Sequence, residues 1–201
     1  MTTGAYSAIS SYSRVEILSL LHERAPRTIS ELCEATGLHA NTVREHLQRL
    51  ADGGYVVGEP ERRTTRGRPR VLYSALGTPD VSSPIARGKA RAAALRGDLM
   101  RRILPGSKSS DLSPEALHQL DALTEDLTDA GFDPLVDESA LTVDLSPCLQ
   151  APAEASRRQV QCHVHLALMQ GVLSEAGGPI SIAGMRESCD PSQCVVMLRC
   201  S

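Results

Sequence analysis

The stretch that decides the fold is Ser30–Leu50, SELCEATGLHANTVREHLQRL. It predicts two short helices joined at Gly37, with Leu38 filling the elbow between them. In the second helix Val43, Leu47 and Leu50 recur at i, i+4 and i+7, so they share a face that packs inward. The opposite face then carries polar side chains that suit base edges in the major groove of DNA: Asn41, Thr42, Arg44, Glu45, Gln48 and Arg49. The alternative is a plain helical hairpin with a solvated face.

A basic hairpin follows these helices. Tyr55–Val57 and Val71–Tyr73 are β-prone runs, and Gly67 and Pro69 break the segment between them. The arginines of this segment repel one another unless an anion lies among them, and arginine enters narrow minor grooves readily. They are Arg62, Arg63, Arg66, Arg68 and Arg70. A solvated charged hairpin is the alternative, but the preceding helices favour a DNA-binding wing.

Upstream of the motif, Ser13 and Glu16 match a capping box, which predicts a helix to about Arg24. Pro26 ends that helix, and the extended pair Thr28–Ile29 is suited to pairing with the wing strands. Ser30 is then expected to cap the next helix.

The remaining chain divides by composition and by hydrophobic pattern. Residues 77–83 predict a linker, and Ile85–Leu104 predicts a helix that is either a dimerisation helix or a solvated basic connector. The acidic half alternates helical and strand-like segments, namely residues 113–131, 140–145, 154–176, 179–184 and 195–198. We therefore expect an α+β protein with a winged helix-turn-helix at 1–76, a linker and dimerisation helix at 77–110, and a small sensor domain at 111–201.

Charge and length restrict the function. The net charge of −3 divides into +2 for residues 1–75, +5 for 76–110 and −10 for 111–201, which predicts one module that meets phosphate and one that avoids it. No run approaches the roughly 20 apolar residues of a membrane span. The N-terminus has neither the basic start nor the apolar run of a secretory signal. We expect a cytoplasmic protein with reduced cysteines and no membrane partner.

Five of the six cysteines lie in the last third of the chain: Cys148, Cys162, Cys189, Cys194 and Cys200. Cys33 is expected to be a small core residue of the first motif helix. Cys148 follows a strand, Cys162 shares a helix face with His165, and Cys194 opens the last strand, so three elements can converge on one point. Packed thiolates repel one another, which points to zinc, an iron–sulfur cluster or a redox role rather than structural disulfides.

The segments TISELCEATGLHANTVREHLQRLADGGYV and RGRPRVLYS resemble bacterial winged-helix repressors of the arsenic-repressor and deoxyribonucleoside-repressor types. In these proteins Ser or Thr usually stands at the helix cap that His39 occupies here. From about Leu123 to Leu198 the chain resembles the sensor half of SufR-type iron–sulfur repressors. The matching residues are Ala130–Pro134, Leu145–Cys148, Cys162–His165 with Leu168 and Gly171, and Cys194 with its strand.

The resemblance implies that Cys148, Cys162 and Cys194 hold an iron–sulfur cluster, with the 4Fe–4S form favoured. The further ligand stays open among His165, His163, Cys189 and Asp190, with a slight preference for His165. Cys189 is an alternative to Cys194, and Pro147–Cys148 reverses the order Cys-Pro that is usual in the family. Two other uses of the cysteines also stay open, namely a structural Cys₃His zinc site and a disulfide switch of Cys189 with Cys194 or Cys200.

The same resemblance implies a homodimeric regulator, expected to be a repressor. It would bind double-stranded DNA at an inverted-repeat operator near iron–sulfur assembly genes and sense oxidant, nitric oxide or iron status. Catalysis is not expected, because the sequence has no Gly-rich phosphate loop, HExxH motif or nucleophile elbow. Cys162 with His163 or His165 lacks an obvious third catalytic group. We therefore expect neither an enzyme nor a small-molecule substrate.

Overall fold

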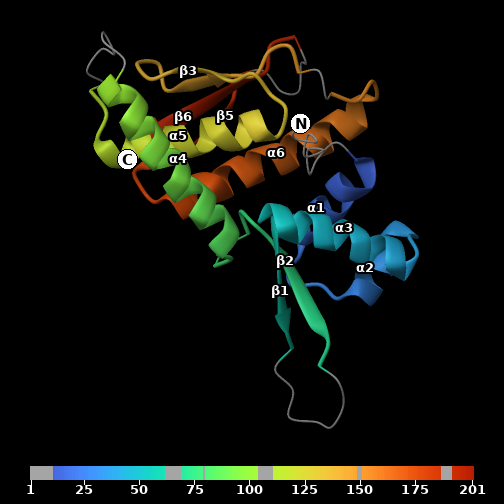
Figure 1. The fold of residues 1–201 in the computed structure, drawn as a ribbon. Coiled ribbons are helices and arrows are strands. Elements are labelled where there is room, and N and C mark those ends of the chain that lie inside the picture. Colours follow the sequence, from blue (N-terminus) through green and yellow to red (C-terminus); the bar gives the residue numbers. More distant parts are fainter. Residues whose placement is uncertain (1–10, 62–68, 79, 104–110, 149–150, 187–191) are drawn as a thin grey trace, which may run out of the picture.

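The computed structural model is an α+β fold in which a winged helix-turn-helix joins a small helix-and-sheet domain (Figure 1). It describes residues 11–61, 69–78, 80–103, 111–148, 151–186 and 192–201. The predicted fold class is confirmed.

The helix-turn-helix consists of α1 (Tyr12–Glu23), α2 (Ile29–Thr36) and α3 (Ala40–Gly53). Gly37 ends α2 in the left-handed conformation with φ 69°, as the expected turn requires. The predicted inward face of α3 is confirmed, because Val43, Leu47 and Leu50 are buried.

The helix caps differ from the prediction. Ser13 lies inside α1, whose N-cap is Ser11 and makes no side-chain capping bond. The ring of Tyr12 stacks under Arg157 of the sensor half at 4.5 Å, so a tertiary contact holds the extra helical residue. Ser30 does not cap α2, since Thr28 and Glu31 form the capping box instead.

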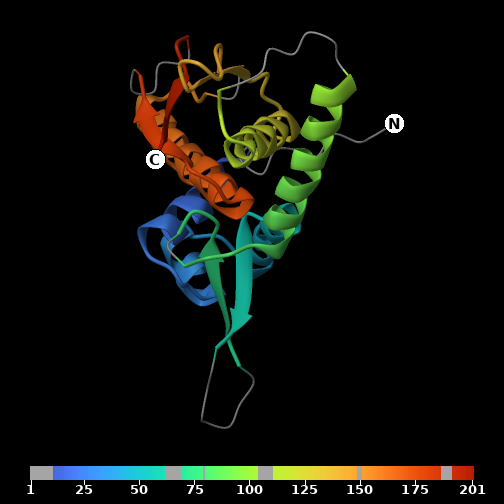
Figure 2. The same cartoon turned by 90° about the vertical axis from the view of Figure 1, so that its left-hand side faces the viewer.

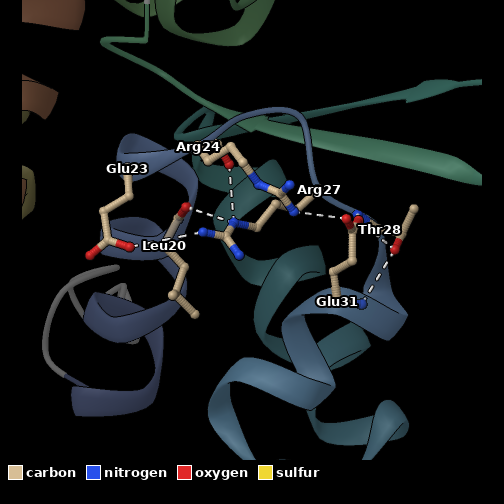
Figure 3. A network of polar contacts seen from close by, with 6 residues as sticks. All are labelled: Leu20, Glu23, Arg24, Arg27, Thr28 and Glu31. Atoms are coloured by element: carbon tan, nitrogen blue, oxygen red, sulfur yellow. Dashed lines mark hydrogen bonds and ion pairs between the residues drawn. The ribbon is translucent and has the colours of Figure 1, made fainter.

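A polar network around Arg27 fixes the link between α1 and α2 (Figure 3). The Arg27 Nε donates to the carbonyl oxygens of Leu20 at 2.9 Å and Arg24 at 3.0 Å, which satisfies the end of α1. Arg24 donates to Glu31 at 2.9 Å, and Glu31 also accepts from the backbone of Thr28 at 2.7 Å. The Arg27 backbone forms a β-bridge with Tyr73, so the extended piece does pair with the wing, through Arg27 rather than Thr28 and Ile29.

The wing is an antiparallel pair of β1 (Val56–Pro60) and β2 (Val71–Ala75), close to the predicted strands. It projects from the body on the side away from the four-stranded sheet (Figure 2). Residues 62–68 between the strands, which include Arg62, Arg63, Arg66 and Arg68, lie outside the described residues.

Three helices complete the fold: α4 (Pro84–Ile103), α5 (Pro114–Asp129) and α6 (Ala155–Ala176). The predicted start of α5 is confirmed, because the Ser113 hydroxyl accepts from the Ala116 amide at 3.2 Å and Pro114 takes the first helical position.

The four-stranded antiparallel sheet has the order β3-β4-β6-β5. Its strands are β3 (Leu135–Asp137), β4 (Thr142–Asp144), β5 (Ile180–Met185) and β6 (Val195–Cys200). The sequence predicted three of them, and the three-residue strand β3 was missed.

Helix α6 belongs to two hydrophobic cores. Val164, Leu168 and Val172 pack with α1–α3, the wing and α4, whereas Met169 and Leu173 pack with α5 and the sheet. Figure 1 shows α6 crossing the molecule between the sheet and the helix-turn-helix. The DNA-binding half and the cysteine-containing half therefore share this helix.

Candidate functional site

The outer face of α3 is a preorganised polar surface. The His39 Nδ1 accepts from the Asn41 amide at 3.2 Å, so the histidine caps the helix at the expected position. Arg44 donates to the Asn41 side chain at 2.8 Å, and both side chains are exposed.

Further along α3 the polar side chains are held by pairs on the same helix. Gln48 donates to Asp52 at 2.7 Å, and Arg49 forms an ion pair with Glu45 at 2.6 Å. Of the predicted surface residues, only Thr42 is partly covered. The surface matches the requirement for groove reading, which needs exposed side chains with paired donors and acceptors.

One arginine of the predicted wing, Arg70, lies among the described residues. Arg70 is exposed, and its carbonyl accepts from the Glu61 amide at 2.7 Å, which extends the strand pairing towards the tip. The four other predicted arginines belong to the segment outside the described residues.

The second part of the candidate site is a cavity in the cysteine-containing C-terminal half. Cys148, Cys162, Cys194 and His165 all line it, and the cavity is small, with a volume of about 20 Å³, and partly open to solvent. The lining is otherwise apolar apart from Arg158 and Gln161. Three separate elements thus bring their cysteines to one place: the turn after β4, helix α6 and the start of β6.

Backbone hydrogen bonds hold two of these elements together. The Leu145 amide donates to the Cys194 carbonyl at 2.8 Å, and the Cys194 amide donates to the Ser146 hydroxyl at 2.8 Å. Hydrogen bonding to Cys148, followed by burial and the nearby Cys162, raises the pKa of the Cys194 thiol. The Cys194 thiol therefore remains protonated at neutral pH unless a cation binds it.

His165 presents a buried nitrogen without a partner. Its ring packs edge-on against Phe132, with ring centroids 5.0 Å apart, and its Nε2 finds no hydrogen-bond partner among the described residues. Burial lowers the pKa of His165 to about 4, so the imidazole is neutral at pH 7. A neutral imidazole is the form that binds metals.

Of the other candidate ligands, the structure describes only His163. His163 is exposed and does not line the cavity. It lies close to His22 of α1, whose pKa is lowered mainly by burial and further by His163. Cys189 and Asp190 lie outside the described residues. Cys33 contacts the helix-turn-helix core as expected, and Cys200 is exposed on β6.

The described residues include no group of three close metal donors. Within the described ranges, no three His, Cys, Asp or Glu side chains lie close enough to hold a single metal ion, and the five described cysteines form no disulfide.

Sequence reasoning missed two features of the site. Arg158 and Gln161 line the cavity one helical turn before Cys162 and His165, a spacing that marks a shared face. Tyr55, which follows α3, donates from its hydroxyl to Asp126 of α5 at 3.1 Å, and no sequence signal joins these two residues.

Comparison with known proteins gives one match. Residues 11–57 match the model of a family described as bacterial regulatory protein, arsR family. No curated protein and no solved structure matches the chain at a significant level. The matched residues cover α1–α3 and reach the first wing strand, so the chain carries a helix-turn-helix of DNA-binding transcriptional regulators. Among the described residues, no helix combines the length and the apolar character needed to cross a bilayer.

Proposed function

We propose that this protein, a DNA-binding transcriptional regulator with an arsR-type helix-turn-helix, is a repressor controlled by an iron–sulfur cluster in the sensor half. The cluster ligands are Cys148, Cys162 and Cys194. The observation that carries the proposal is the cavity that these three cysteines line together.

The chemistry of the donors supports an iron–sulfur cluster. Cysteines bind such clusters as thiolates, and a bound cation favours the deprotonated form of each ligand. His165 is the further ligand that fits best, because its Nε2 is buried beside the same cavity and lacks a partner among the described residues. The bound cluster would supply a centre that oxidant, nitric oxide or iron shortage can dismantle.

Zinc and a disulfide switch are the alternatives. A structural zinc ion would be colourless and would bring no acid-labile sulfide, so metal and sulfide analysis distinguishes it from a cluster. The disulfide switch pairs Cys189, which lies outside the described residues, with Cys194 or Cys200.

The exposed face of α4 supports a homodimer. Leu95, Leu99, Met100 and Ile103 are between 47% and 64% exposed, and they form an apolar stripe along the last turns of the helix. A second copy of the chain would cover this stripe and place two recognition helices about 34–36 Å apart on an inverted-repeat operator.

Oxygen-free purification tests the cluster directly. The wild-type protein should be coloured and should contain iron and acid-labile sulfide. Cys162→Ser should lose both, whereas Cys200→Ser should keep both, because Cys200 is exposed and does not line the cavity. A colourless, iron-free wild-type protein would end the proposal.

The effect of the cluster on DNA binding is measured with duplexes that the wild-type protein selects from a random pool. The cluster-loaded protein should bind the selected duplex more tightly than the cluster-free protein does. Equal affinity in both states would remove the cluster from the regulatory role. Mapping of bound sites on the genome of the host organism then tests whether iron–sulfur assembly genes are the targets.

A further inference from the structure

Helix α6 connects the cysteine cavity with the wing. Cys162 and His165 lie in its first half, and Gly171 lies nine residues after Cys162. At 1.5 Å per residue this is about 14 Å along the helix axis. The segment between them is buried between the two cores and makes the intrahelical hydrogen bonds of a continuous helix.

At Gly171 the backbone of α6 packs directly against Leu76 and Gly77, the two residues that follow the wing. A Cβ atom on Gly171 would stand 2.5 Å from the Leu76 Cγ and 2.7 Å from the Gly77 amide nitrogen. In return, a Cβ on Gly77, which has a φ of 88°, would overlap the carbonyl group of Ala167 on α6. Both glycines are required by this approach.

Leu76 and Gly77 are a direct continuation of wing strand β2. The Leu76 amide donates to the Tyr55 carbonyl at 2.8 Å, which adds a hydrogen bond to the body end of the wing. Leu76 is 1% exposed and lies in the core that contains α3. A shift of this segment therefore moves the base of the wing.

A second contact ties α6 to the start of α4. The side chain of Glu175 is 5% exposed, accepts from the Ser83 amide and pairs with Arg87 at 3.0 Å. Because Glu175 lies four residues after Gly171, α6 holds both ends of the segment 76–83 that joins the wing to α4.

We propose that α6 transmits the state of the cysteine site to the wing through the contact of Gly171 with Leu76 and Gly77. This inference rests on the proposed function in one respect, since it takes the cysteine cavity as the sensor. A displacement of α6 at Cys162 reaches Gly171 because a buried helix moves as a stiff body. At Gly171 no side chain absorbs the displacement, so the wing backbone follows it.

The test is Gly171→Ala, whose methyl group overlaps Leu76 and pushes the wing from its position. The variant should keep the iron and sulfide content of the wild type, because the substitution leaves the cavity lining intact. Its affinity for the selected duplex should fall about tenfold or more. The ratio of affinities between cluster-loaded and cluster-free protein, typically 5–150-fold in allosteric proteins, should approach one.

The matched control is Gly88→Ala on α4, where a Cβ atom meets no described atom within 4 Å. It makes the same helical glycine-to-alanine change without the overlap, and light scattering checks that the oligomeric state of both variants is that of the wild type. A folded Gly171→Ala protein with wild-type affinity and a wild-type ratio would overturn the inference.

Hydrogen exchange of the wild-type chain provides a measurement that does not depend on the folding of a variant. Exchange protection of the amides of residues 71–77 should change when the cluster is removed. Unchanged protection together with a changed DNA affinity would also overturn the inference.

The two proposals fail differently. If the wild-type chain takes up no cluster, the proposed function fails. Gly171→Ala still decides the inference in that case, because the contact positions the wing in the cluster-free protein as well. DNA affinity equal to that of Gly88→Ala would then refute it.

Discussion

The carboxyl group of Asp126 should make the stability of this protein depend on pH in an unusual direction. Asp126 lies on α5, where it accepts a hydrogen bond from the hydroxyl of Tyr55, the residue that follows the recognition helix, at 3.1 Å. Burial raises the pKa of Asp126 from its ordinary value of 3.8 to about 6, although Lys89 and the Tyr55 hydroxyl oppose the shift and Asp129 adds to it. The surrounding pocket also contains the carboxylate of Glu125.

Because the folded pKa is raised, the native state binds the proton of Asp126 more tightly than the unfolded chain does. Its contribution to stability is fully present below pH 3.8 and is lost as the pH rises through about 6. The interval between the two pKa values, at about 1.36 kcal/mol per pKa unit, corresponds to about 3 kcal/mol. Ionised Asp126 therefore costs the native state about that much at neutral pH.

Asp126→Asn removes the ionisation and keeps an oxygen that can accept from Tyr55. Urea unfolding followed by circular dichroism at pH 4 and pH 8 measures the free energy of unfolding of both proteins. The variant should gain about 2 kcal/mol relative to the wild type between pH 4 and pH 8, because part of the shift has already been lost at pH 4. Taking the difference cancels the histidines, whose contributions are common to both proteins.

Tyr55→Phe provides the control for the hydrogen bond. The Tyr55 hydroxyl lowers the pKa of Asp126, so its removal should raise that pKa and move the pH transition upwards. If the stability difference between Asp126→Asn and the wild type stays constant from pH 4 to pH 8, the assigned ionisation of Asp126 is wrong.

Three other outcomes are expected. Asn41→Ala or Arg44→Ala should relax base preference at the contacted positions by about 1–3 kcal/mol. Binding to a panel of single-base variants of the selected duplex measures this preference. Equal losses of affinity on selected and random DNA would show that α3 does not read sequence. Arg66→Ala combined with Arg68→Ala should weaken binding to selected and random duplexes alike. The slope of log affinity against log salt concentration should fall by the equivalent of about one to two phosphate contacts, and an unchanged slope would exclude phosphate contacts by these arginines. Leu99→Asp should abolish the dimer in light scattering, because it places a charge in the apolar stripe of α4, and a dimer that persists at micromolar concentration would exclude this interface.

Local patterns in the sequence were sufficient for the helix-turn-helix. The inward spacing of Val43, Leu47 and Leu50, the left-handed Gly37 and the cap at His39 are all found in the structure. Each depends on residues within about two helical turns of one another, so the chain near them specifies the conformation. The wing strands followed for the same reason, since β-prone runs around a glycine and a proline form a local hairpin.

The helix starts show where local patterns compete. Ser13 with Glu16 and Thr28 with Glu31 both match the capping-box pattern, but only the second pair forms it. A contact with Arg157, distant in the sequence, adds Tyr12 to α1 and moves Ser13 into the helix interior. Capping energies of about 1 kcal/mol are small enough for such packing to override them.

By itself the sequence determined most of the elements, the candidate DNA-reading helix and the set of cysteines that could converge. The sequence already favoured His165 slightly over His163, and the structure places His165 at the cavity. Tertiary structure alone decided that Asp126 lies half-buried against Tyr55 and that Gly171 meets Leu76 and Gly77. The physical reason is the separation along the chain over which each effect acts. Periodicity and capping act between neighbours in the chain, whereas burial and close approach depend on how α6 packs between two cores whose residues are far apart in sequence.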